Sequence, residues 1–160
     1  MNSEHYSDID NINVGNPEID EDHHALAQLI HKVANVCKCS LRSVCDCDNC
    51  PESKPIDCFD SLVEIGHEIM LRMIEHFHHE EELMKSLRRN RVTRDHCVAH
   101  KQEHVNFSTR YNQAVSKINA NRPVVGLRTL ETFIIDWVRS HVLEYDMKLA
   151  ALLETETSSR

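Results

Sequence analysis

The stretch LVEIGHEIMLRMIEHFHHEEELMKSL, residues 62–87, decides the fold. Its apolar residues recur at steps of three and four, which places them on one face of an α-helix. That face also carries two ionisable residues four positions apart, His76 and Glu80. The whole face consists of Leu62, Ile65, Ile69, Met73, His76, Glu80, Met84 and Leu87. A helix of this kind, predicted over residues 60–88, has to bury its apolar face against other helices.

Three further segments show the same helical periodicity, at residues 23–37, 94–119 and 123–149. Asp20 or Asp22 is positioned to cap the first of them. Glycine (3) and proline (4) are scarce, which favours helices over structures with many turns. Four amphipathic helices predict an all-α fold, an antiparallel up-down-up-down four-helix bundle.

The chain of 160 residues is expected to form a single domain, residues 1–160, that includes an irregular N-terminal arm at residues 1–17. Residues 154–160 are expected to be frayed. A cysteine-rich loop, residues 38–58, is predicted between the first two helices because prolines and acidic residues interrupt the apolar pattern. Six of the seven cysteines lie in or beside it: Cys37, Cys39, Cys45, Cys47, Cys50 and Cys58. Their spacing leaves three alternatives open: an unstructured thiol loop, a second metal site, or a redox-reactive loop.

The charge of the chain excludes one class of partner. It carries 26 acidic against 18 basic residues, a net charge of −8, and such a surface repels nucleic acid. The apolar runs are too short to span a bilayer, so no membrane partner is expected. The first residues, MNSEHYSDID, lack the pattern of a secretory signal, and a cytoplasmic location is therefore expected.

Several ionisable residues lie on the apolar faces of the four predicted helices. They are His23, His76, Glu80, His100, His104, His141 and Asp146. Each alone is explained as readily by a surface position, but buried ionisable groups in this number are costly unless they are paired or bound to metal. A pair of metal ions satisfies them together. Imidazole and carboxylate ligands without thiolate suit iron, whereas a structural zinc site takes only four ligands.

Four motifs that carry these residues resemble the hemerythrin family, specifically the bacteriohemerythrins. They are GNPEIDEDH (15–23), HFHHEEELM (76–84), HKQEHVNF (100–107) and WVRSHVLEYD (137–146). They occur in the family's order and span nearly the whole chain. The resemblance implies a four-helix bundle with a non-haem di-iron centre.

The resemblance also implies a role for each ligand. One iron would take three histidines, His100, His104 and His141. The other iron would take His23 and His76 and keep an open position. Two carboxylates, Glu80 and Asp146, would bridge the irons together with a hydroxide or oxo group. The walls of a dry pocket would come from apolar residues: Leu26, Phe77, Phe107, Ile134 and Trp137.

The function that the resemblance implies is reversible dioxygen binding for carriage, storage or delivery, with no enzymatic activity. The alternatives are a di-iron sensor of oxygen, redox state or nitric oxide, or an oxidase-type enzyme. Di-iron oxidases of the ferritin type use two Glu-x-x-His motifs, and none occurs at the candidate ligands of this chain.

The third helix offers two possible ligand pairs, because His96, His100 and His104 are all four residues apart. The pair His100 and His104 is preferred, since Phe107 then takes the position that it has in the family. On the second helix, Glu81 and Glu82 are expected to face solvent, because each residue turns the helix by about 100° away from Glu80.

Overall fold

The computed structural model describes residues 9–36, 47, 54–88 and 90–158, and within them the chain is helical with no strand. Its elements are the helices α2 (Pro17–Val36), α3 (Lys54–Ser86), α4 (Arg91–Val115), α5 (Pro123–His141), the π-helical turn η2 (Val142–Asp146) and α6 (Met147–Ser158). The predicted all-helical fold is confirmed.

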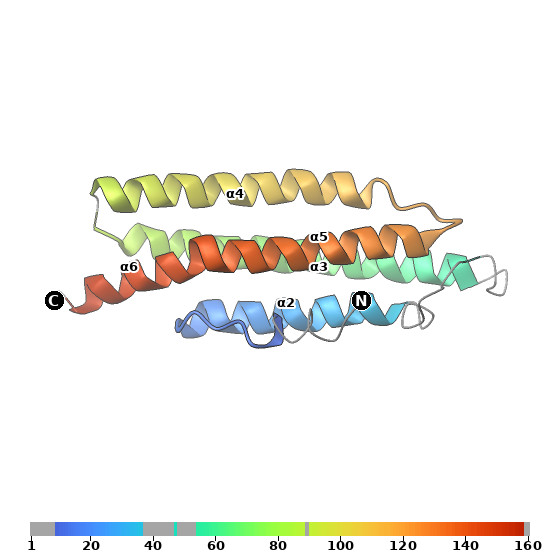
Figure 1. Cartoon of the computed structure of the whole chain (residues 1–160), viewed down its shortest axis with the longest axis horizontal. Helices are drawn as coiled ribbons and strands as arrows, with labels where there is room; N and C mark the ends of the chain where they lie inside the picture. Colours follow the sequence, from blue (N-terminus) through green and yellow to red (C-terminus); the bar gives the residue numbers. More distant parts are fainter. Residues whose placement is uncertain (1–8, 37–46, 48–53, 89, 159–160) are drawn as a thin grey trace.

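The four long helices α2, α3, α4 and α5 lie along one common axis (Figure 1). Helix α2 packs against α3 and α5, and α4 packs against the same two helices. Helix α6 continues α5 beyond the π-helical turn towards the C-terminus. Each long helix therefore presents its apolar face to a shared core, as the amphipathic pattern requires.

The first helix begins earlier than the sequence pattern suggested. Proline is favoured in the first turn of a helix, and α2 begins at Pro17. The side chain of Asn16 accepts hydrogen bonds from the backbone N–H groups of the first turn, so it is the cap. Asp20 instead accepts from the N–H of Gly15, which has a positive φ of 83°. The prediction of a cap at Asp20 or Asp22 is therefore wrong.

The predicted cysteine-rich loop overlaps the second helix. Helix α3 begins at Lys54, so residues 54–58 are helical and not part of a loop. Pro55 is tolerated there because a first-turn N–H has no partner within the helix. Cys58 lies one turn further on and is buried. Most of the other residues of the predicted loop lie outside the described part of the chain. A second metal site and a redox-reactive thiol loop would involve those residues, so both stay predictions.

Both ends of the chain contain more helix than predicted. Ile9 and Asp10, within the predicted irregular arm, are helical, and Ile9 packs into the main core. Helix α6 extends to Ser158, so the prediction of a frayed end from residue 154 is wrong for residues 154–158. Among the described helices, none combines the length and apolarity needed to cross a membrane.

Gly126 marks a close approach between α5 and the turn before it. A Cβ atom added there would lie 2.9 Å from Cγ1 and 3.1 Å from Cα of Ile118. We expect Gly126→Ala to lower the free energy of unfolding by about 1 kcal/mol, because overpacking costs about 1–3 kcal/mol and the gain in helix propensity is about 1 kcal/mol. Urea denaturation followed by circular dichroism measures the change.

Gly66→Ala provides the comparison, because a Cβ there meets only the hydroxyl of Tyr111, at 3.2 Å. We expect a smaller loss for this variant. A Gly126→Ala protein that is as stable as the parent would show that the turn before α5 packs more loosely than the structure indicates.

Candidate metal centre

The seven predicted site residues converge in the core of the bundle. Their positions are His23 on α2, His76 and Glu80 on α3, His100 and His104 on α4, His141 at the end of α5, and Asp146 at the end of η2. All are buried, with at most 4% of each residue exposed. Since the four long helices all contribute, the cluster can form only when the bundle is assembled.

The carboxylate of Asp146 lies between two groups of histidines. Its Oδ2 atom is 3.1 Å from Nε2 of His23. Its Oδ1 atom is 3.0 Å from Nε2 of His141 and 3.2 Å from Nε2 of His100. One oxygen therefore faces α2, and the other faces α4 and α5. This division is what a carboxylate that bridges two metal ions requires.

Glu80 makes a similar set of contacts from the opposite helix. Its Oε2 atom is 3.1 Å from Nε2 of His104 and 3.4 Å from Nε2 of His100. The same oxygen is 3.6 Å from Nε2 of His76 and 3.7 Å from Nε2 of His141. The second oxygen, Oε1, is buried and has no hydrogen-bond partner among the described residues. An unpartnered buried carboxylate oxygen is costly, and a cation would satisfy it.

The donor atoms form two overlapping sets, each compact enough to bind one ion. The first comprises Glu80, His100, His104 and His141, and the second comprises His76, Glu80, His141 and Asp146. Within each set the ligand atoms lie within 4.8 Å of one another. His23 belongs to neither set, but its Nε2 contacts Asp146, a member of the second set. Nε2 of His100 also lies 3.0 Å from Nε2 of His141, and two facing imidazole nitrogens can share at most one proton. The residues therefore fit a pair of metal ions.

The electrostatics of the cluster agree with its donor set. Burial opposes the ionisation of Glu80 and Asp146, but the surrounding histidines hold the pKa of each carboxyl well below its usual range. Burial likewise disfavours a charged His141, but Asp146 and Glu80 outweigh it and raise the pKa of His141 to about 9. Positive charge beside them therefore favours the ionised form of both carboxyls, which is the form that binds metal, and a metal ion would displace the proton of His141.

A π-helical turn allows His141 and Asp146 to reach the same site. In an α-helix, residues five positions apart are rotated by about 140° relative to each other, so only one of them would face the core. The wider turn Val142–Asp146 accommodates one extra residue and returns Asp146 to the face that carries His141. Their side chains then meet at 3.0 Å.

Aromatic rings pack around the imidazoles. Phe77 stacks on His104 with ring centroids 4.0 Å apart, and Trp137 stacks on His141 at 4.2 Å. The residues expected to line a dry pocket are all buried: Leu26, Phe77, Phe107, Ile134 and Trp137. These contacts fix ring orientations and keep water from the donor atoms.

His96, the alternative ligand on α4, lies beside the cluster and belongs to neither donor set. Its ring centroid is 5.3 Å from that of His100, and its Nε2 has no hydrogen-bond partner in the described part of the chain. Burial lowers the pKa of His96 to about 4, so its ring is neutral. His104, by contrast, contacts Glu80 directly. The geometry favours His100 and His104 as the pair.

We expect His104→Ala to lose metal from the core, whereas His96→Ala should retain it. The reason is that, of these two residues, only His104 contributes a nitrogen to a donor set. Equilibrium titration of each variant with cobalt(II), followed by its visible absorption, measures the difference. Retention by His104→Ala together with loss by His96→Ala would shift the ligand pair by one helical turn.

Two carboxylates beside the cluster were not predicted from the sequence. Glu81, expected to face solvent, keeps 34% of its side chain exposed, but its Oε1 also lies 3.3 Å from Nδ1 of His104. Asp22 has its Oδ2 3.5 Å from Nδ1 of His76 and 2.8 Å from Nδ1 of His79. Both residues directly precede or follow a site residue in sequence. That adjacency was the available signal, but only the packing of the helices shows which imidazole each one reaches.

Together, the fold and the cluster define a helical-bundle protein with a histidine- and carboxylate-rich metal site. The family model described as the hemerythrin HHE cation binding domain matches residues 14–153, and the chain therefore belongs to the hemerythrin family. The matched region contains all seven site residues, and the resemblance seen in the four sequence motifs is confirmed. No curated protein and no solved structure gives a significant match to the chain.

Proposed function

We propose that this protein binds dioxygen reversibly at a di-iron centre, for carriage, storage or delivery. The observation that carries the proposal is the division of the Asp146 carboxylate, with one oxygen near His23 and the other near His100 and His141. A single mononuclear site would not need a carboxylate that faces two separate groups of imidazoles. Membership of the hemerythrin family supports the same reading.

In this proposal, one iron is bound by His100, His104 and His141, and the other by His23 and His76. Glu80 and Asp146 would hold both ions, because each carboxylate lies near histidines of both groups. When bound, the iron pair would supply the electrons for reversible binding of dioxygen. The distances of Glu80 to histidines of both groups, 3.1 Å to His104 and 3.6 Å to His76, support this assignment.

The protein residues provide the orientation of the ligands and a dry environment. Trp137 and Phe77 stack on ligand rings, and Ile134 and Leu26 are buried in the same core. These buried residues would exclude water and so limit the access of protons to the site. The bundle order that we propose is antiparallel and up-down-up-down. Its support is that the α3–α4 and α4–α5 connections lie at opposite ends of the long axis (Figure 1).

The donor set favours binding over oxidase chemistry. Only two carboxylates lie among five imidazoles in the cluster of described residues. Ferritin-type di-iron oxidases present more carboxylates, from Glu-x-x-His pairs on two helices. Neutral imidazoles leave the centre with fewer negative ligands, and we propose that the protein is accordingly not an enzyme.

Elemental analysis tests whether the protein binds two irons per chain, on which the proposal depends. Protein loaded anaerobically with iron(II) and freed of excess metal should contain two irons per chain. Iron bound at one per chain, or zinc retained in both positions after iron loading, would contradict a di-iron centre.

A further inference from the structure

His104 differs from the other four histidines of the cluster in the surroundings of its outer nitrogen. The Nδ1 atoms of His23, His100 and His141 are buried and have no hydrogen-bond partner among the described residues. Nδ1 of His76 is 3.5 Å from Asp22, a contact not aligned as a hydrogen bond. Nδ1 of His104, in contrast, is hydrogen-bonded to Oε1 of Glu81 at 3.3 Å.

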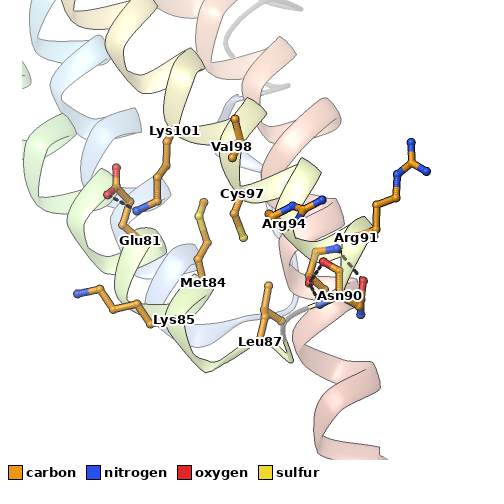
Figure 2. A pocket seen from close by; sticks show the side chains of 11 residues that line it. Glu81, Met84, Lys85, Leu87, Asn90, Arg91, Arg94, Cys97, Val98 and Lys101 are labelled. Carbon is orange, nitrogen blue, oxygen red and sulfur yellow. Dashed lines mark hydrogen bonds and ion pairs between the residues drawn. The ribbon is translucent and has the colours of Figure 1, made fainter.

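Glu81 is itself fixed from the other side. Nζ of Lys101 donates a hydrogen bond to its Oε2 at 2.8 Å, so each carboxylate oxygen has one partner. Figure 2 shows Lys101 on α4 bending towards Glu81 on α3, at the edge of a groove between the two helices. The side chains of Glu81 and Lys101 are 34% and 43% exposed, so this pair forms the boundary between the buried cluster and solvent.

The contact has a defined consequence for a metal-binding imidazole. A histidine that binds metal through Nε2 carries its proton on Nδ1, and an acceptor at Nδ1 fixes the orientation of the ring. A carboxylate acceptor also raises the basicity of the ligand. Nε2 of His104 points to Glu80 at 3.1 Å, and its ring plane is held against Phe77 with an interplanar angle of 9°. Glu81 therefore fixes the one remaining degree of freedom, which is rotation within that plane.

We propose that Glu81, which Lys101 holds in place, is a positioning residue that orients His104 and strengthens its bond to the metal in the three-histidine position. This inference rests on the proposed metal-binding function. It explains why the acidic run 80–82 contains two residues with separate roles: Glu80 contacts metal-binding atoms inside, and Glu81 supports one ligand from outside.

The chain offers a matched control in Glu82. This residue is next to Glu81, its side chain is 49% exposed, and its ion pair is with Lys85 on the same helix. We expect Glu81→Ala to weaken cobalt(II) binding at the three-histidine position by about 10–100-fold, the usual effect of losing such a partner. Glu82→Ala should remain within about twofold of the parent. Circular dichroism of each metal-free variant confirms that it is folded.

The conservative variant Glu81→Gln separates positioning from general stability, because its amide oxygen still accepts a hydrogen bond from Nδ1–H. It should recover part of the affinity lost in Glu81→Ala. In the zinc-loaded parent, proton NMR should show a His104 Nδ1–H that exchanges slowly with solvent. That resonance should exchange faster in Glu81→Ala and be restored in Glu81→Gln.

Three results would overturn the inference: equal affinities for Glu81→Ala and Glu82→Ala, no recovery in Glu81→Gln, or an unchanged exchange rate of the His104 proton. The number of metal ions that the parent protein binds distinguishes failure of the proposed function from failure of this inference. If the parent binds fewer than two metal ions, the di-iron proposal and this inference both fail. If the parent binds two and the variants match it, only the role of Glu81 fails.

Discussion

Replacing Glu80 by alanine should abolish metal binding at both positions of the core. Glu80 is fully buried, and its Oε2 contacts histidines assigned to both ions, His104 at 3.1 Å and His76 at 3.6 Å. Loss of a directly bound carboxylate should reduce affinity by more than the roughly 10–100-fold cost of losing an outer partner. Elemental analysis after iron loading and removal of excess metal should therefore find no iron retained in the core of the variant.

The same substitution should destabilise the metal-free bundle. Removing one member of a buried ion pair lowers the free energy of unfolding by about 3–5 kcal/mol, because the charge of the partner stays buried without an opposite charge beside it. Chemical denaturation measures this change. Glu82→Ala, in an exposed ion pair, should stay within about 0.5 kcal/mol of the parent. If both variants retain iron and stability equally, Glu80 belongs to a solvated acidic run and the assignment of the cluster is wrong.

Removing the metal should lower the melting temperature of the parent protein substantially. Glu80 Oε1 is buried with no hydrogen-bond partner among the described residues, and a metal ion would satisfy it. A ligand that binds only the folded state at about 100 times its dissociation constant adds about 2.7 kcal/mol. For a domain of this size, that corresponds to a rise in Tm of roughly 5–10 °C.

Calorimetry of the metal-loaded protein, with and without a chelator, measures this shift. Glu80→Ala is the control, since a protein that binds no metal should melt at one temperature under both conditions. An equal Tm for loaded and chelated parent would mean that the seven residues form a polar network that is stable by itself.

The sequence predicted those parts of the site that depend on regular helical geometry. His76 and Glu80 are four residues apart, as are His100 and His104, and that spacing places each pair on one helix face. The structure brings both pairs together in the core. Their position on otherwise apolar faces was the decisive signal, because exposed histidines need no such alignment.

Features that depend on irregular geometry or on contacts between helices could not be predicted in this way. Asp146 was expected on the same face as His141, but a regular α-helix would rotate it away from that face. The expectation holds only because η2 is a π-helical turn, which the spacing of five residues does not itself show. Glu81 is rotated away from Glu80 on its own helix, yet it reaches His104 because α4 packs on that side. The start of α3 at Lys54 was hidden by Pro55, which can interrupt a helix or begin one.

The most direct test of a reversible dioxygen-binding centre is the visible absorption spectrum of the iron-loaded protein through one cycle of oxygenation. We expect a nearly colourless reduced form, a strong visible band on exposure to air, and return to the colourless form when dioxygen is removed. Repeated cycles should give the same amplitude. A band that persists after dioxygen is removed, or no dioxygen-dependent band at two irons per chain, would contradict reversible binding.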